Sequence, residues 1–129
     1  MSASPEGGTH RLRVRYAETD RMGVAHHGSY VDWMEEARTE WLRQGGKTYR
    51  QWEDEGVLLQ VVEVHLRYMK TTTYDDEVEI RTSVAARGRA SITLEYEMRL
   101  VGDDELVAVG RTKLACVDGA GRLQRLPAL

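Results

Sequence analysis

The chain has 129 residues, enough for one hydrophobic core and too few for two independent domains. Hydrophobic residues make up 41% and charged residues 30%, which is typical of a globular protein and excludes a disordered one. The formal net charge is −3, from 18 basic and 21 acidic residues, so no overall positive field favours nucleic acid.

The sequence also indicates where the protein works. No run approaches the roughly 18 apolar residues that span a bilayer, and the N-terminus has no apolar signal segment, so we expect no membrane association. Cys116 is the single cysteine. It excludes an internal disulfide and fits a reducing compartment, so we expect a cytoplasmic protein.

Small and polar residues at positions 1–10 predict a flexible tail, followed by one domain over residues 11–129. Strand-like alternation begins at once, with Leu12, Val14 and Tyr16 on one face and arginines on the other. We therefore predict that the first strand starts at Arg11.

The period then changes to that of a helix. From Ser29 onward, apolar residues recur at helical spacing, and Gly45-Gly46 provides a stop, which predicts about four turns. Gly28-Ser29 is a candidate N-cap. The stretch Thr48 to Glu55 predicts a short second helix.

Alternation of period two returns at Val57 and continues to Val117. Turn residues divide this region into four strands joined by short connections, which implies antiparallel neighbours. The last strand, Leu106 to Val117, carries apolar residues on both faces and so predicts a central or interface position. The expected fold is α+β, a curved antiparallel five-stranded sheet wrapped around one long helix. Because one helix is too small to cover such a sheet, partner chains are expected.

The segment between the first strand and the long helix carries a family resemblance. Residues 13–30 read RVRYAETDRMGVAHHGSY, and residues 35–43 read EEARTEWLR. Together they resemble the signature of the hotdog-fold acyl-CoA thioesterases of the 4-hydroxybenzoyl-CoA thioesterase type. The resemblance is close over about thirty residues and looser through the later strands.

The resemblance implies two catalytic groups. Asp20 corresponds to the aspartate that attacks the thioester carbonyl or activates a water, and both roles stay open. The backbone N–H at His27 corresponds to the donor that polarises the carbonyl. The helix start suits this second role, since it offers unpaired N–H groups and partial positive charge. Asp20 could instead be an ordinary loop cap.

Other residues of the motif are expected to contact the substrate, namely Gly23, His26 and Tyr30. No metal or other cofactor is expected, since adjacent histidine side chains usually diverge and no further ligands accompany His26 and His27 at zinc spacing. Glu35 and Arg38 are interpreted as a structural i,i+3 pair. Glu35 or Glu36 is the fallback catalyst, and Cys116 is expected to be inert.

Coenzyme A adds phosphates, which favour arginine side chains and backbone amides. The turn formed by Arg87, Gly88, Arg89 and Ser91 resembles the nucleotide-contacting turn of relatives, although a basic hairpin can also serve solubility alone. We expect an acyl-CoA substrate and a homodimer or homotetramer with active sites at the subunit interface. Two alternatives remain: a non-catalytic acyl-CoA or lipid sensor, and a hotdog hydratase or dehydratase.

Overall fold

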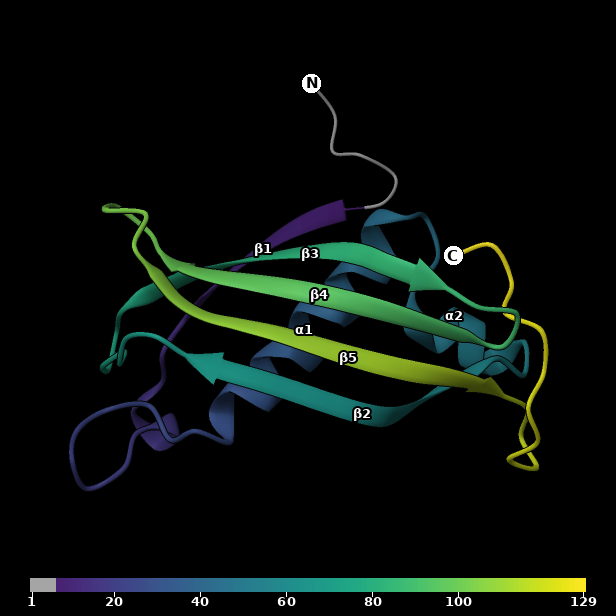
Figure 1. Ribbon diagram of the computed structural model, residues 1–129, viewed down its shortest axis with the longest axis horizontal. Helices are drawn as coiled ribbons and strands as arrows, with labels where there is room; N and C mark the ends of the chain where they lie inside the picture. The colour runs from purple at the N-terminus through teal and green to yellow at the C-terminus, as the bar shows by residue number, and fades with distance from the viewer. Residues whose placement is uncertain (1–6) are drawn as a thin grey trace.

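The computed structural model describes residues 7–129, which form a five-stranded antiparallel sheet curved around one long helix (Figure 1). The sheet order is β1-β3-β4-β5-β2. The elements in chain order are β1 (Gly7–Arg13), a 3₁₀ turn η1 (Tyr16–Glu18), α1 (Ser29–Gln44), α2 (Tyr49–Asp54), β2 (Leu58–Tyr68), β3 (Glu77–Arg87), β4 (Ser91–Leu100) and β5 (Leu106–Val117). The α+β architecture predicted from the sequence is confirmed.

The prediction for the start of the chain is partly wrong. Residues Gly7 to His10 are not a tail, because they open β1 and pair with β3 from Ser83 to Ile80. Residues 1–6 of the predicted tail lie outside the described part of the chain. Tyr16 was expected on the apolar face, but it is 78% exposed because the chain leaves the sheet after Arg13 and turns into η1.

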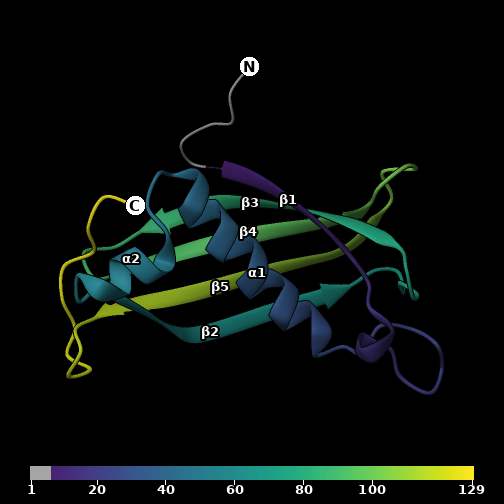
Figure 2. The same cartoon turned by 180° about the vertical axis from the view of Figure 1, so that it is seen from behind.

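Helix α1 lies across the concave face of the sheet (Figure 2). The residues that it buries recur every three or four positions, as predicted: Tyr30, Trp33, Met34, Ala37 and Trp41. Burying each large apolar side chain stabilises the fold by about 1.5–3 kcal/mol. The helix starts after Gly28, which makes no side-chain cap, and ends at Gly45.

The middle of the sheet forms the other half of the core. Every second residue of β4 faces the helix and is at most 2% exposed: Ile92, Leu94, Tyr96 and Met98. Strand β5 lies between β4 and β2, which confirms its predicted central position. At Gly110 of β5 a Cβ atom would lie 2.5 Å from the Met34 sulfur, so any larger residue there would require the Met34 side chain to move.

Strands β1 and β2 are the two edges of the sheet, and β2 is the more apolar. Val62, which is 51% exposed, lies at a register shift between Val61 and Glu63. The residues of β2 that face the helix side are also open, with Val64 at 42% and Tyr68 at 45% exposed. Within residues 7–129, no helix is long and apolar enough to cross a membrane.

Candidate active site

The segment between η1 and α1 forms a small loop with Asp20 near its tip. Thr19 and Ala25 form an antiparallel bridge, and the Asp20 N–H donates to the Val24 carbonyl at 2.9 Å. The turn closes when the Gly23 N–H donates to the Asp20 carbonyl at 3.0 Å. Gly23 has a φ of 80°, a left-handed conformation that glycine adopts at little cost. The predicted tight turn is therefore present.

The Asp20 side chain is exposed to solvent. Its Oδ1 accepts a hydrogen bond from the Met22 N–H at 2.8 Å, and within residues 7–129 no partner is found for Oδ2. The carboxylate therefore stabilises its own turn with one oxygen and leaves the other without a partner among the described residues. The cap interpretation and the catalytic interpretation are compatible.

The end of α1 next to this loop offers a free donor. Among the described residues, none accepts a hydrogen bond from the His27 N–H. The carbonyl of the same residue accepts from the Tyr68 hydroxyl at 2.9 Å, which holds this stretch of backbone against β2. Burial raises the pKa of Tyr68, so this hydroxyl keeps its proton and continues to donate. The geometry leaves an oriented N–H at a helix N-terminus, where negative charge is stabilised.

His26 has a structural role that the sequence did not reveal. Its Nδ1 accepts from the Gly28 N–H at 3.0 Å, so it caps the start of α1 and its ring proton lies on Nε2. The expectation that the two histidine rings diverge is wrong, since their centroids lie 4.2 Å apart. Even so, no cluster of three potential metal ligands occurs in residues 7–129.

Glu18 is a site residue that the sequence analysis missed. Its side chain is only 12% exposed, and Oε2 accepts from the Trp33 indole N–H at 2.9 Å. Its backbone carbonyl accepts from the His26 N–H at 2.7 Å and from the Ser29 hydroxyl at 3.1 Å. Glu18 thus joins the Asp20 loop to α1. In the sequence, the position of Glu18 two residues before Asp20 is the one feature that could have indicated this role.

Tyr30 was expected to contact substrate, and the structure places it in the core directly behind the helix start. It is 2% exposed and shares a 3.0 Å hydrogen bond with Thr72, which is fully buried. Burial raises the pKa of Tyr30, so the hydroxyl stays protonated. The Thr72 carbonyl also accepts from the Ala25 N–H at 2.8 Å. Tyr30 and Thr72 therefore hold the loop against the core: Tyr30 bonds to the Thr72 hydroxyl, and the Thr72 carbonyl accepts from Ala25 of the loop.

The predicted coenzyme turn lies far from this loop within one chain. The loop contacts the segment just before β3 through a bridge between Val24 and Thr73, whereas Arg87 is the last residue of β3. Eleven residues of strand separate these points by roughly 33 Å. Figure 1 shows the loop and the β3–β4 hairpin at opposite ends of the sheet. One chain therefore does not bring Asp20 together with Arg87, Gly88, Arg89 and Ser91.

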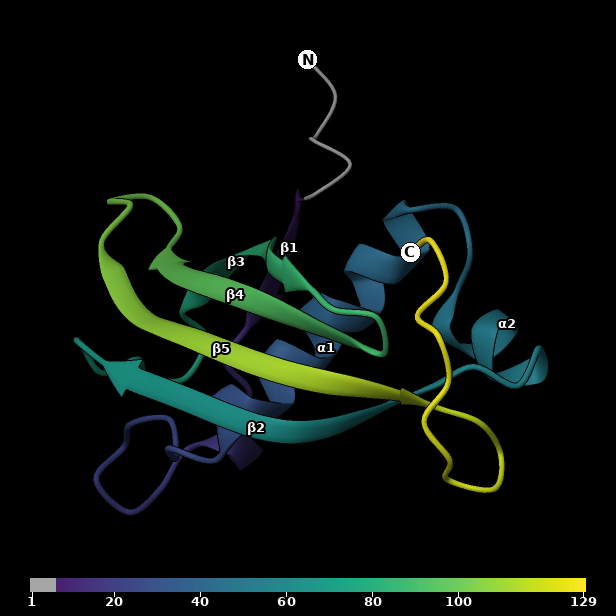
Figure 3. The same ribbon diagram turned by 45° about the vertical axis from the view of Figure 1, so that its right-hand side comes forward.

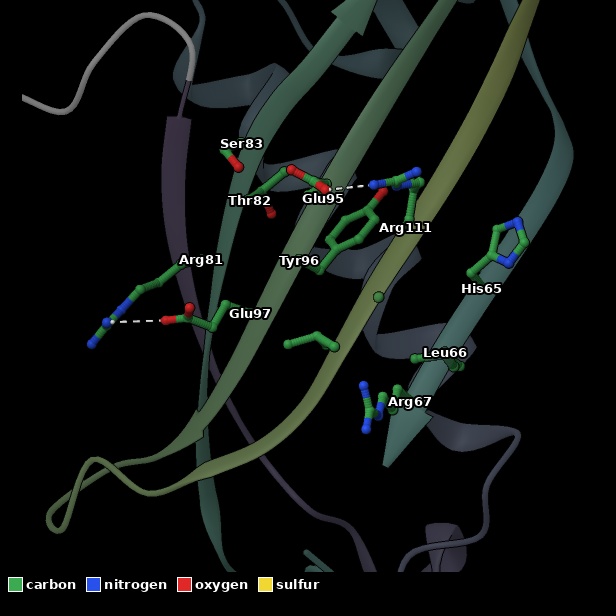
Figure 4. A pocket seen from close by; sticks show the side chains of 12 residues that line it. His65, Leu66, Arg67, Arg81, Thr82, Ser83, Glu95, Tyr96, Glu97 and Arg111 are labelled. Atoms are coloured by element: carbon green, nitrogen blue, oxygen red, sulfur yellow. Dashed lines mark hydrogen bonds and ion pairs between the residues drawn. The ribbon is translucent and has the colours of Figure 1, made fainter. Parts of the chain in front are cut away.

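A groove of about 700 Å³ on the outer face of the sheet is not part of this site. Figure 4 shows its charged side chains on the strands, with the helix behind them. Ion pairs cross its floor, from Arg81 to Glu97 at 3.4 Å and from Arg111 to Glu95 at 3.0 Å. None of its lining residues belongs to the Asp20 loop. Cys116 is buried on the helix side of the sheet, and burial raises its thiol pKa, which fits an inert residue.

Comparison with known proteins places the chain in a family. The model of the thioesterase-like superfamily matches residues 14–128. A putative esterase of Aquifex aeolicus is 32% identical over 118 residues, which is 92% of this chain and 90% of that protein. The acyl-CoA thioesterase YbgC of Haemophilus influenzae is 33% identical over 108 residues, 83% of this chain and 78% of the relative.

Comparison of the fold with solved structures also points to thioesterases. The solved structure of a DHNA-CoA thioesterase from Staphylococcus aureus superposes with a TM-score of 0.88 at 31% identity, covering 93% of this chain and 80% of that one. A curved five-stranded sheet around one helix, with this loop before the helix, defines the hotdog class. The chain belongs to the thioesterase-like superfamily, and the resemblance found in its sequence is confirmed.

Proposed function

We propose that this thioester hydrolase cleaves acyl-CoA substrates with Asp20 and the backbone N–H of His27 as its catalytic groups. The observation that carries the proposal is a free N–H at the start of α1 beside a loop that presents a carboxylate oxygen. Thioester hydrolysis requires this combination, a base or nucleophile and a donor for the developing oxyanion. The names of the relatives, several of them acyl-CoA thioesterases, support the substrate class.

Two reaction courses fit these groups. Asp20 can attack the carbonyl carbon, so that a C–O bond forms, the C–S bond breaks and the CoA thiolate leaves; water then hydrolyses the acyl anhydride. Alternatively, Asp20 takes a proton from a water whose oxygen attacks the carbonyl carbon; the C–S bond then breaks, and the CoA thiolate leaves and takes up the proton from Asp20. In both courses the carbonyl oxygen gains negative charge, which the His27 N–H and the helix end would stabilise.

We further propose that the active enzyme is a homodimer paired through β2, from which a homotetramer can assemble. An unpaired edge strand with half-exposed valines is a template for pairing with a second copy. Pairing would cover Val62 and Val64, and it would shield the exposed Asp20 loop near Tyr68 from solvent. It also lets Arg87, Gly88, Arg89 and Ser91 of another copy bind the CoA phosphates. The cytoplasmic location stays a prediction from the single cysteine.

A sensor that binds acyl-CoA without cleaving it is the second candidate. The hydrogen bond from the Met22 N–H to Asp20 favours it, because a carboxylate used as a turn cap has a purely structural explanation.

Replacing Asp20 with asparagine separates the two candidates. Asparagine can still accept the Met22 hydrogen bond, but it is a poor nucleophile and base. We expect kcat to fall by about 1,000-fold or more, while acyl-CoA binding persists. Thiol release from a set of acyl-CoAs measures the rate, and calorimetry measures the binding.

Asp103→Asn is the matched control, because the Asp103 Oδ1 likewise accepts an N–H two residues ahead, from Glu105 at 3.0 Å. This variant should keep wild-type activity. Full activity in Asp20→Asn would remove Asp20 from the mechanism. Tight binding without turnover in the wild type would favour the sensor.

A further inference from the structure

Tyr68 links the edge of the sheet to the start of the long helix. It is the last residue of β2, and its ring packs against the buried Tyr30 of α1, with the ring centroids 5.0 Å apart. Its hydroxyl donates to the His27 carbonyl at 2.9 Å. Tyr68 therefore connects an edge strand with the residue whose N–H is proposed to polarise the thioester carbonyl.

The first turn of α1 does not supply the His27 carbonyl with a good donor of its own. The Val31 N–H, which would bond to this carbonyl in a regular α-helix, donates to the Gly28 carbonyl instead, at 3.1 Å. The Tyr30 N–H reaches the His27 carbonyl only at 3.4 Å, which is long for such a bond. Among the described residues, the Tyr68 hydroxyl is thus the closest donor to this carbonyl.

The other hydrogen bonds around the His27 N–H are local. The His26 carbonyl accepts from the Ser29 N–H at 2.9 Å, and the His26 Nδ1 accepts from the Gly28 N–H at 3.0 Å. These contacts fix the shape of the backbone, but they do not fix where that backbone lies relative to the sheet. The Tyr68 contact does so, because it joins residues 41 positions apart in the sequence.

The segment of residues 68–73 also holds the loop that carries the proposed catalytic carboxylate. The Thr72 carbonyl accepts from the Ala25 N–H at 2.8 Å, and Thr73 forms an antiparallel bridge with Val24. Figure 2 shows β2 ending beside this loop. One short segment at the end of β2 therefore holds both the carboxylate loop and the backbone of the oxyanion donor.

We propose that Tyr68 is a positioning residue, whose hydroxyl holds the His27 N–H in the place where it can reach the carbonyl that Asp20 attacks. The inference rests on the proposed catalytic roles of Asp20 and His27, and it adds a residue of the sheet to them. An oxyanion donor acts only when it points to the place where negative charge develops. A small displacement of the donor therefore lowers the rate without weakening the binding of the rest of the substrate.

The test is the variant Tyr68→Phe, which removes only the hydroxyl and keeps the ring that packs against Tyr30. Wild type and variant are assayed with acetyl-CoA, decanoyl-CoA and benzoyl-CoA. For the substrate that the wild type cleaves fastest, kcat should fall by about tenfold, while KM should stay within about twofold. Sedimentation velocity should give the same mass for both proteins.

Infrared spectroscopy reports the position of the donor directly. The ligand is the ketone analogue of the acyl-CoA that the wild type binds most tightly, with a methylene in place of the thioester sulfur and an isotope-labelled carbonyl. A hydrogen bond from the His27 N–H lowers the carbonyl stretching frequency. The band of the bound ketone should therefore lie at a lower frequency in the wild type than in Tyr68→Phe.

Tyr49→Phe is the matched control. The Tyr49 hydroxyl also bonds to backbone, since it accepts from the Leu59 N–H at 3.1 Å, but Leu59 lies near the opposite end of β2 from Tyr68. This variant should keep the wild-type kcat, KM and carbonyl band.

An unchanged kcat or an unchanged carbonyl band in Tyr68→Phe would overturn the inference. A raised KM with the wild-type kcat would also overturn it, because Tyr68 would then act by contacting the substrate. A smaller mass for Tyr68→Phe would assign the loss of activity to assembly instead. If the wild type cleaves none of the three substrates, the proposed function fails, and the carbonyl band still shows whether Tyr68 positions the donor.

Discussion

The two ends of the sheet differ in what they offer a substrate. One end carries the Asp20 loop, the free His27 N–H and the Tyr68 hydroxyl. The other end carries the Arg87–Arg89 hairpin, held by the C-terminal segment through a 2.7 Å hydrogen bond from the Leu126 N–H to the Arg89 carbonyl (Figure 3). Groups suited to cleaving a thioester and groups suited to binding phosphate are thus separated by the length of a strand.

The difference between the two sheet edges suggests how these ends meet. β1 is a short edge with alternating arginines, which discourages pairing, whereas β2 is long and carries exposed valines. Antiparallel pairing of two β2 strands about a two-fold axis reverses one sheet relative to the other. The arginine end of each chain would then lie on the same side as the Asp20 end of its partner.

Breaking the β2 edge should have the largest effect on this arrangement. Val62→Asp places a charge in the proposed interface, where two copies would face each other across the axis. We expect a monomer and a loss of activity of about 100-fold or more, because the site loses its partner. Sedimentation velocity measures the mass. Thr9→Lys on β1 is the control and should leave both the mass and the activity unchanged. A fully active Val62→Asp monomer would contradict the proposal that β2 is the edge through which the active dimer forms.

Removing the arginine end should have an intermediate effect. Arg87→Ala combined with Arg89→Ala should raise KM for acyl-CoA by about 10- to 100-fold, since two charge-assisted contacts to phosphate are lost. The same variant should keep the wild-type KM for an acyl-pantetheine thioester, which has no nucleotide. Equal changes for both substrates would place the nucleotide elsewhere.

Loosening the Asp20 end should have the smallest effect. Glu18→Ala leaves the buried Trp33 indole N–H without its acceptor, which costs about 1–3 kcal/mol of stability. We expect a lower Tm and a kcat reduced by about tenfold, because the loop loses its side-chain link to Trp33 of α1 and keeps only the backbone contacts of residue 18. Glu18→Gln restores an acceptor oxygen and should recover most of both. An unchanged kcat in Glu18→Ala would show that the loop is positioned without Glu18.

Much of the fold follows from the sequence because its periodicity is strong. α1 and β4 were predicted to within a residue or two, since Trp33, Met34 and Trp41 or Ile92, Leu94 and Tyr96 mark one face throughout. The start of β1 was missed because Gly7-Gly8 has no alternation, and its pairing with β3 supplies the strand instead. The local sequence pattern does not show which distant strand a segment pairs with.

The site was predicted less completely for a similar reason. The motif placed Asp20, His27 and Gly23 in one loop, and the turn at Gly23 is confirmed; the catalytic roles of Asp20 and His27 stay predictions. The capping role of His26 and the link from Glu18 to Trp33 depend on side-chain directions in the folded loop. The separation of Asp20 from Arg87 depends on which strand ends coincide in the sheet, and the spacing between motifs does not contain this information.

The most direct test of the composite site is complementation between two inactive variants. One chain carries Asp20→Asn, and the other carries Arg87→Ala with Arg89→Ala; the two are unfolded together, refolded and assayed at low substrate concentration. If each site takes Asp20 from one copy and the arginines from another, half of randomly formed dimers contain one intact site. Activity should then return to about a quarter of the wild-type value. A mixture no more active than the sum of the two variants would contradict the account.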